Sequence, residues 1–581
     1  MSKAYLATTA IEDFWDDRLP ILFLGEWCLL HRRRRVWNGL RHRMLPPRWP
    51  DREETDRARA YLAALYEEVL VRLGATLDGI HGGSRSPRYW RILLGFWLHN
   101  YIRVLHERYG SLRRAFDAEP ELTTIGLDSA CFVTPKESND FTMWIQEDAY
   151  NLQIYTRLWQ AMGMSFPVKA LAEDRRPISS PVSRSSGGVL EMLLRLIRGG
   201  PGKIILCGSY FPRRFQVRLA IRSAGGIISV QQGPHALSAG HLNQTARRGL
   251  ASALPINNSF EKVLAVMLTD DIPRCFVEDF AAVGETASRH YPRSPKAILS
   301  AAWNPHEPFK RWAAEAQEHG TLLLCSQHGG GYGMVSNFAF EDHDMAIADR
   351  FYSWGWVSGK SPERIVPMPG GRLMGRNQLG ADRHKQGILL VTTMSSRYPW
   401  SQFEHPFSEY LKWQARFLAA FPHALRDELR LRPHREDGGW DIVQRLRDQG
   451  FSVQIEDWGR LFYQSLNECR LYVSDHLSTT FIESLSADKP TVLFWSPQAE
   501  LLRSEAIPYC EELKSAGILF DTPEEAAAAV GPIYEDVESW WRNPRRQEIR
   551  KKFCSEFGST SAEAESAWEK ELSSILEGRK V

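Results

Sequence analysis

Residues 470–494 read RLYVSDHLSTTFIESLSADKPTVLF, and this stretch decides the fold class. Two short apolar runs, at 470–474 and 490–494, lie on either side of a helical stretch at 478–488. Short apolar strands that end in polar turns are typical of a parallel sheet covered on both faces. The stretch therefore predicts two parallel strands joined by a helix in a right-handed crossover.

The same alternation extends through the whole C-terminal region. Further strand-like runs lie at 387–393, 429–433, 451–455 and 517–520. Helical stretches lie between them at about 402–420, 441–449, 458–468 and 498–515, and another begins near Pro523. Six such units in succession predict a doubly wound α/β domain.

A second group of apolar runs lies upstream. Lys203–Cys207, Gly226–Val230 and Thr321–Cys325 are short and branched, and each ends at a polar or glycine-rich turn. They also suit parallel strands that are buried on both faces. Nearer the N-terminus, the pattern predicts strands at Ala4–Ala7 and Ile21–Gly25 and helices at about 53–73 and 89–116.

The length of the chain and two breaks in its pattern indicate the domains. A chain of 581 residues is too long for a single core. Residues 172–188 have the composition of a surface linker, and the proline- and glycine-rich segment 361–386 is interpreted as the interdomain connection. We therefore expect an N-terminal Rossmann-like domain at 1–360 with helical insertions, and a second Rossmann-like domain at 387–581.

Composition and charge limit the classes of function to be expected and indicate where in the cell the protein acts. A formal net charge of +2 gives no reason to expect nucleic-acid binding. The eight cysteines include no CxxC pair, so we expect no disulfide framework or zinc site and a reducing cytoplasm. There is no secretory signal and no apolar run of the roughly 20 residues that a membrane span needs. The basic run Arg32–Arg35 is either a solvated face or a contact with the anionic inner membrane surface.

Hydroxyl side chains follow the strand at 470–474. In parallel sheets, ligands bind beyond the carboxyl ends of the strands, at helix N-termini. Ser478, Thr479 and Thr480 lie at that position and open the helix that carries Glu483. Hydroxyls at the positive end of a helix suit a phosphate, so these four residues are predicted to bind a nucleotide or its phosphate. Ordinary N-capping is the alternative.

Basic side chains follow the strand at 429–433. Arg432 and His434 lie at its carboxyl end, where a guanidinium group and an imidazole could hold a phosphate. Arg435 is equally well explained as a solvated residue paired with Glu436 or Asp437.

A glycine-rich loop follows the strand at 321–325. The sequence SQHGGGYG at 326–333 lets the backbone approach a ligand closely, and we expect Gln327, Gly329 and Gly330 to line the acceptor side. His328 is predicted to act in acid–base or phosphate chemistry. Glu341 and Asp342 could serve as nucleophile, base or charge stabiliser. A tight turn before a charged helix start is the alternative.

Three further residues are weaker candidates. Glu26 ends the second N-terminal strand, where a carboxylate is either catalytic or paired with the nearby arginines. Gln232 and His235 follow the strand at 226–230 and could line the acceptor side, although a simple turn also explains them.

Five motifs in order resemble a known family. They are LFLGEWC at 22–28, YWRILLGFWL at 89–98, QHGGGYG at 327–333, FEDHDMAIADRFYSWGW at 340–356 and SDHLSTTFIES at 474–484. Together they resemble a bacterial family of transferases encoded in surface-polysaccharide and O-antigen clusters, over nearly the whole chain. The C-terminal half also resembles the donor domain of GT-B glycosyltransferases. A more distant similarity is to Kdo (3-deoxy-manno-octulosonic acid) and sialic acid transferases, which use CMP-activated sugars.

The resemblance implies a GT-B-like fold of two Rossmann-like domains facing a cleft, with additional N-terminal helices. It implies sugar transfer from a nucleotide donor, such as CMP-Kdo, to a surface polysaccharide or glycolipid in the cytoplasm. By similarity to the Kdo and sialic acid transferases, His434 and Ser478-Thr479 would surround the donor phosphate. Those enzymes have the order His-Pro, whereas the order here is Pro433-His434. No permanently bound cofactor and no metal are implied. A sugar-nucleotide epimerase, a glycerol-phosphate-type transferase and a non-catalytic glycan-binding or assembly protein are the alternatives.

Overall fold

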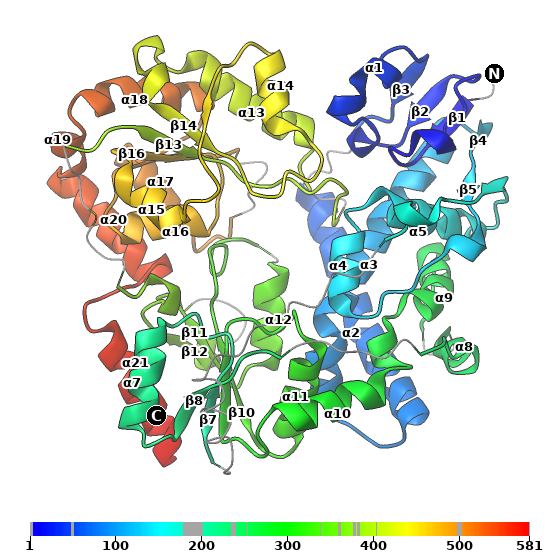
Figure 1. Ribbon diagram of the computed structural model, residues 1–581, viewed down its shortest axis with the longest axis horizontal. Coiled ribbons are helices and arrows are strands. Elements are labelled where there is room, and N and C mark those ends of the chain that lie inside the picture. Colours follow the sequence, from blue (N-terminus) through cyan, green and yellow to red (C-terminus); the bar gives the residue numbers. More distant parts are fainter. Residues whose placement is uncertain are drawn as a thin grey trace.

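The computed structural model describes residues 4–47, 52–177, 202–233, 240–251, 254–336, 338–357, 362–375, 379, 384–401, 404–496 and 502–579. In this part of the chain, two six-stranded sheets and one four-stranded sheet are built only from parallel neighbours (Figure 1). The expected α/β class with two doubly wound sheets is confirmed.

The C-terminal sheet has the strand order β15-β14-β13-β16-β17-β18. Its strands are β13 (Ile388–Val391), β14 (Leu429–Arg432), β15 (Gln454–Ile455), β16 (Leu471–Ser474), β17 (Thr491–Phe494) and β18 (Leu519–Phe520). All six lie inside the predicted runs. The direction of winding reverses between β13 and β16, which is where open α/β sheets bind their ligands.

Helices cover both faces of this sheet. They are α13 (Phe407–Ala420), α14 (Ile442–Asp448), α15 (Phe462–Glu468), α16 (Thr479–Ser486), α17 (Ile507–Ser515) and α18 (Pro523–Glu535). Of the helix predicted at 498–515, residues 498–501 lie outside the described residues, and α17 begins at Ile507. Pro508 fits its first turn because no N–H donor is needed there.

The other six-stranded sheet has the order β12-β11-β10-β9-β7-β8. Its strands are β7 (Ile204–Leu206), β8 (Ile227–Ser229), β9 (Ala297–Ser300), β10 (Leu322–Ser326), β11 (Arg350–Ser353) and β12 (Ile365–Pro367). The sequence predicts β7, β8 and β10. Strand β12 lies inside the segment 361–386 that was interpreted as a connection, because it pairs in parallel with β11.

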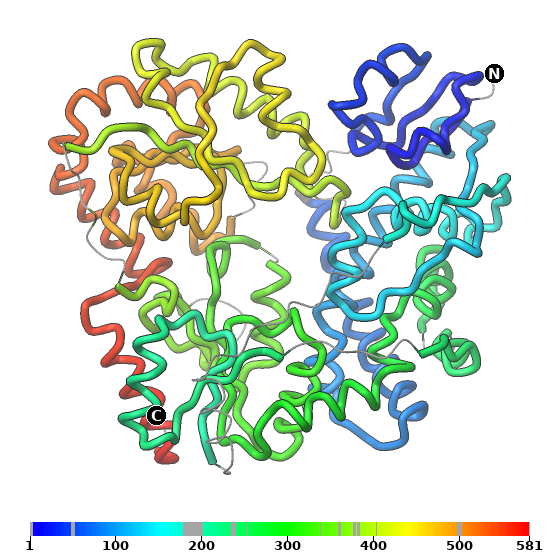
Figure 2. Tube along the Cα trace, viewed as in Figure 1, coloured from blue at the N-terminus to red at the C-terminus, as the bar shows by residue number. Residues whose placement is uncertain are grey.

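The last helix of the chain returns to this sheet. Helix α21 (Ala564–Glu577) packs with α7 (Arg213–Arg222) on one face, and Trp568 and Leu572 lie in the same apolar cluster as Ile204 and Leu299. Figure 2 traces the chain to its C-terminus beside α7.

The N-terminal part forms a separate layer. Strands β1 (Ala4–Ala7), β2 (Ile21–Phe23), β3 (His42–Met44) and β4 (Leu122–Thr123) form the four-stranded sheet, in the order β3-β2-β1-β4. Two long helices, α2 (Arg52–His81) and α3 (Pro87–Ala118), run from it towards the β7–β12 sheet (Figure 1). The region predicted as one Rossmann-like domain therefore contains two separate parallel sheets.

The remaining elements complete the description. They are α1 (Arg34–Trp37), α4 (Ser138–Trp144), α5 (Asp148–Ala161), α8 (Gln244–Ala251), α9 (Ser259–Asp271), α10 (Phe280–His290), α11 (Glu307–Glu318), α12 (Ala339–Ile347), α19 (Val537–Trp541), α20 (Pro544–Phe557), β5 (Gly126–Leu127) and β6 (Val168–Lys169). Among the described helices, none combines the length and apolar character that crossing a bilayer requires.

Candidate functional site

The glycine-rich loop after β10 meets the first turn of α16. We call residues 327–333 the glycine loop and its contact with Ser478 and Thr479 the junction. The Gly330 N–H donates to Oγ1 of Thr479 at 2.9 Å. A Cβ atom at Gly330 would lie 2.5 Å from the Ser478 carbonyl oxygen, and one at Gly329 would lie 2.5 Å from Thr479 Oγ1. Only glycine allows this approach, so the sequence brings the two predicted sites together.

Gln327 holds the glycine loop in shape. Its side-chain amide donates to the Gly329 carbonyl at 2.9 Å. Its Oε1 accepts hydrogen bonds from the Trp354 N–H and the Trp356 ring N–H, both at 2.9 Å. Since these contacts use both ends of a buried amide, Gln327 holds the loop in shape and has no side-chain atom of the amide left over.

His328 is one end of a buried hydrogen-bonded chain. Its Nδ1 lies 2.8 Å from the Tyr332 hydroxyl, which donates to Oδ2 of Asp344 at 2.9 Å. Burial, with a contribution from the nearby Arg372 charge, lowers the pKa of His328 to about 4. Burial raises the pKa of Asp344 to about 8. At neutral pH both side chains are therefore uncharged.

The proton on Asp344 decides the tautomer of His328, because a hydroxyl has one proton to donate. When Asp344 is ionised, Tyr332 donates to it and accepts from Nδ1–H of His328. When Asp344 is protonated it can donate to Tyr332, which then donates to Nδ1 and leaves the histidine proton on Nε2. The protonated form thus makes Nε2 a hydrogen-bond donor.

Glu341 braces the glycine loop from α12. Its Oε2 accepts from the Gly333 N–H at 2.8 Å, and its Oε1 pairs with Arg503 at 2.6 Å. Burial raises its pKa, although Arg503 opposes the shift. Asp342, the next residue, lines a large cavity between α12 and helices α2 and α3, to which Glu341 also contributes.

Hydroxyl groups are concentrated at the start of α16. Ser478 is the N-cap and accepts from the Thr480 N–H at 3.3 Å. Thr480 Oγ1 lies 3.0 Å from Ser478 Oγ and accepts from the Tyr472 hydroxyl at 2.9 Å. Glu483, one turn along the helix, pairs with Arg372 at 2.5 Å. N-capping and a hydroxyl cluster therefore occur together here.

An acid–histidine pair beside α16 is absent from the sequence-based predictions. Asp475 and His476 follow β16, and the Asp475 Oδ1 lies 2.8 Å from the His476 Nδ1. Asp475 Oδ2 accepts from Tyr410 at 2.9 Å and Gln414 at 3.0 Å. An aspartate and a histidine directly after an apolar strand are the sequence signal that could have identified this pair.

Arg432 and His434 lie at the same edge of the sheet as Ser478, because β14 and β16 both flank β13 in parallel. Arg432 is buried, donates to the Arg460 carbonyl at 3.0 Å and to Ser465 Oγ at 3.3 Å, and stacks over Trp458. These contacts direct its guanidinium into its own domain. His434 is exposed and accepts from the Glu436 N–H at 3.1 Å.

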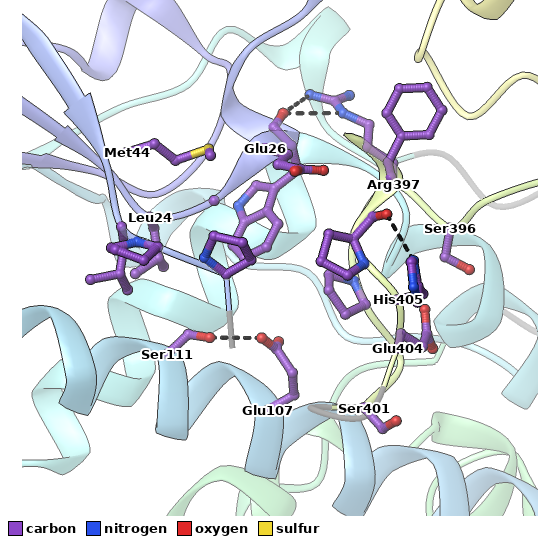
Figure 3. A pocket seen from close by; sticks show the side chains of 18 of the residues that line it. Leu24, Glu26, Met44, Glu107, Ser111, Ser396, Arg397, Ser401, Glu404 and His405 are labelled. Carbon is purple, nitrogen blue, oxygen red and sulfur yellow. Dashed lines mark hydrogen bonds between the residues drawn. The ribbon is translucent and has the colours of Figure 1, made fainter. Parts of the chain in front are cut away.

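Glu26 links the N-terminal sheet to the C-terminal domain. Its Oε2 accepts from the Ser408 N–H at 3.0 Å, and its Oε1 accepts from the Ser408 hydroxyl. Because Ser408 lies in the first turn of α13, Glu26 caps that helix and is not paired with the arginine run. Figure 3 shows it beside a cavity of about 100 Å³.

That small cavity also contains a carboxyl group that titrates near neutrality. Burial raises the pKa of Glu404 to about 7, and its Oε1 accepts from the Trp400 N–H at 2.8 Å. Glu107 and His405 are further polar residues of the lining (Figure 3).

The remaining candidates are placed as follows. Gln232 donates to the Ala302 carbonyl at 2.7 Å, at the carboxyl edge of the β7–β12 sheet, and His235 lies outside the described residues. Two arginines of the basic run form ion pairs with α14 or its N-cap. Arg34 contacts Asp448 at 2.8 Å, and Arg32 contacts the N-cap residue Asp441 at 3.8 Å. Among the residues that the structure covers, no group of three or more His, Cys, Asp and Glu could hold a metal ion.

The model of the LIC12162 family of transferases matches residues 4–572. No curated protein matches the chain.

Three solved structures show remote similarity. A mutant O-GlcNAc transferase of Thermobaculum terrenum is 15% identical, with 91% of this chain and 100% of that chain covered and a TM-score of 0.34. HepE of Anabaena in complex with UDP-glucose is 12% identical, with 65% and 99% covered and a TM-score of 0.37. MurG of Acinetobacter baumannii is 11% identical, with 64% and 98% covered and a TM-score of 0.33. The strand orders above remain the basis of the fold assignment.

Proposed function

The chain belongs to the LIC12162 family of transferases, and on that premise we propose that it transfers a sugar from a nucleotide-activated donor to a glycan or glycolipid acceptor. The observation that carries this proposal is the junction. The glycine loop of one parallel sheet there touches the first turn of the helix at the other sheet's switch point. Such a place suits a phosphate, because helix N–H groups, hydroxyls and close backbone approach combine in it.

The donor phosphate would lie against Ser478, Thr479 and Thr480. In the described conformation the Gly330 N–H donates to Thr479, so the loop lies where a phosphate would be held. Donor binding therefore requires the glycine loop to withdraw from α16. His434 would reach the donor from the neighbouring strand, and a CMP-sugar such as CMP-Kdo is the first donor to test.

His328 would stabilise the departing phosphate. With Asp344 protonated, the neutral imidazole presents Nε2–H as a donor, and a donor aimed at developing negative charge lowers the barrier. Asp342 or Glu341 would accept the proton of the attacking hydroxyl, since both line the cavity on the other side of α12. Glu26 would contribute to domain closure through its contact with α13.

The proposal includes three further expectations. Transfer would need no divalent metal, so activity would persist in EDTA. The protein would act in the cytoplasm, and a glycolipid acceptor would bring it to the inner membrane surface. Liposome sedimentation with anionic lipid at low salt tests that contact.

The decisive experiment is nucleotide titration of matched N-cap variants. Ser478→Ala and Thr522→Ala each remove the N-cap of one helix, α16 or α18, and each should cost about 1 kcal/mol of stability. A nucleotide at 100 times its Kd adds about 2.7 kcal/mol, which a thermal shift detects. We expect Ser478→Ala and His434→Ala to weaken binding of one nucleotide among CMP, UDP and GDP, and Thr522→Ala to leave it unchanged.

Equal nucleotide affinity in all variants would contradict the proposed donor site. Analysis of the reaction products distinguishes sugar transfer from the alternative functions. Transfer to a glycan supports the proposal, whereas epimerised donor or glycan binding without turnover supports one of the alternative functions.

A further inference from the structure

A cavity much larger than the one beside Glu26 lies apart from the junction. It has a volume of about 950 Å³ and is lined by α2, α3, α12 and residues 502–505. We call it the arginine cavity, because Arg59, Arg91, Arg103, Arg364 and Arg503 line it. Its volume lies in the range of sites that hold small ligands, which is about 300–1,000 Å³.

Two of these arginines are neutralised inside the protein. Arg91 contacts both carboxylate oxygens of Glu67, at 2.7 and 2.6 Å. Arg503 pairs with Glu341 at 2.6 Å. A guanidinium bound in this way has its charge balanced, so these two form the fixed wall of the cavity.

The positive charge of Arg103 is not balanced in the same way. Its closest polar contact is His99, whose Nε2 accepts from the guanidinium at 3.2 Å. Within the described ranges, no carboxylate lies within 4.0 Å of it, and Asp342 and Glu404 act on it only from farther away. Burial lowers its pKa, so the folded protein holds this charge at a cost.

Arg59 adds a second positive charge to the cavity lining beside Arg103. It lies close enough to Arg103 for the two cations to repel each other, and its distance to the Asp56 carboxylate is 3.8 Å. Two partly desolvated guanidinium groups side by side are stabilised when an anion lies between them.

A neutral histidine adds hydrogen-bonding capacity. His343 lines the cavity from α12 and is buried, and burial lowers its pKa to about 3. Neither of its ring nitrogens has a hydrogen-bond partner among the described residues. A buried polar group left in this state destabilises the folded protein, and a ligand hydroxyl could recover that loss after a small movement of the ring.

We propose that the arginine cavity binds a sugar bearing an oxyanion, with its phosphate or carboxylate held by Arg59 and Arg103. The anion would neutralise the two guanidinium groups, and the sugar would extend towards α12. Its hydroxyls would then reach Asp342, which the proposed function places at the attacking oxygen. The identification of this ligand as the acceptor rests on the proposed function, whereas the binding of an anionic sugar does not.

Isothermal titration of the full-length protein tests the proposal with defined probes. The probes are glucose 6-phosphate, glucuronate, inorganic phosphate and uncharged glucose. We expect one of the two anionic sugars to bind more tightly than glucose and more tightly than inorganic phosphate. The choice between them identifies a phosphate or a carboxylate as the preferred group.

Three variants assign the site. Arg103→Gln should weaken binding of the anionic sugar about tenfold or more, because it removes charge-assisted hydrogen bonds. Arg103→Lys should recover part of the affinity. Arg72→Gln, on the same helix as Arg59 but exposed and paired with Glu68, should bind as the wild type does.

The melting temperature separates this role from a structural one. Arg103→Gln should melt at or above the wild-type temperature, because it removes a buried, repelled charge. A lower melting temperature with unchanged sugar affinity would overturn the proposal, as would failure of both anionic sugars to bind the wild type.

Failure of the proposed function would look different. If CMP, UDP and GDP all fail to bind but the anionic sugar still binds through Arg103, the donor site is wrong and the arginine cavity stands. If Arg103→Gln abolishes nucleotide binding instead, the cavity holds the donor, and the assignment to an anionic acceptor sugar is overturned.

Discussion

The junction and the arginine cavity are two sides of one short segment, β10 to α12, and they differ in how their polar groups are satisfied. At the junction the protein supplies the partners itself: Thr479 accepts from Gly330, and Glu341 accepts from Gly333. In the cavity, among the described residues, Arg103 has no carboxylate within 4.0 Å and the ring nitrogens of His343 have no hydrogen-bond partner. The difference indicates one site that must open to bind and one that is already open.

The largest expected effect comes from breaking the junction. Gly330→Ala places a Cβ atom 2.5 Å from the Ser478 carbonyl oxygen, so the glycine loop cannot close on α16. We expect the transfer rate to fall about 100-fold or more, since the added methyl group shifts the loop that carries His328, and small displacements of a catalytic group have effects of this size. Nucleotide affinity should not weaken, because the loop is already withdrawn.

Single-turnover kinetics measures the rate, and Gly79→Ala is the control, since a Cβ atom there meets nothing within 4 Å. A Gly330→Ala enzyme with the wild-type rate would show that the position of the glycine loop does not affect transfer.

The interface between the N-terminal layer and the C-terminal domain can be tested through Glu404. Its pKa is raised to about 7 from 4.5, so its stabilising effect is complete below pH 4.5 and is lost as the pH rises through 7. Glu404→Gln should therefore gain about 2–3 kcal/mol of unfolding free energy relative to the wild type between pH 4.5 and pH 8.

Urea denaturation across that pH range measures the difference. Glu511→Gln, an exposed carboxylate paired with Lys514, should show no such trend. A difference that does not change with pH would mean that Glu404 is ionised throughout.

The hydrogen-bonded chain from His328 through Tyr332 to Asp344 predicts that the rate of transfer depends on pH. In the wild type, transfer should fall as the pH rises through about 8, because ionised Asp344 removes the proton from Nε2 of His328. Tyr332→Phe should lower kcat about tenfold and abolish this alkaline limb. Tyr352→Phe, which removes a buried hydroxyl from a contact with Glu571, is the control. If the fall in transfer at high pH persists in Tyr332→Phe, the hydrogen-bonded chain is not its cause.

The smallest expected effect concerns Glu26. Glu26→Ala removes the acceptor at the first turn of α13 and should lower the unfolding free energy by about 1 kcal/mol, as loss of a helix cap does. Chemical denaturation measures this, with Thr522→Ala as a reference for the loss of a cap. Equal stability of the variant and the wild type would show that the contact with Ser408 contributes nothing.

The sequence predicted the C-terminal sheet well because each of its strands is a short apolar run with a turn behind it. Strand β11 escaped prediction because it begins with Arg350, and β3 because His42 and Arg43 are exposed at the sheet edge. For the candidate site, a local rule about strand ends pointed to His328 and Ser478, and the structure brings the loop of His328 to the helix of Ser478. The arginine cavity was not predictable, because it arises only where α2, α3 and α12 pack together.

Helix α21 has a consequence for how this protein is made. It is made long after the strands of the sheet, yet Trp568 and Leu572 cover strands that begin at Ile204. During synthesis, one apolar face of that sheet remains uncovered while more than half of the chain is still being added. The nascent chain therefore exposes an aggregation-prone apolar face until α21 has been made, and a stop codon before Ala564 would leave that face uncovered permanently.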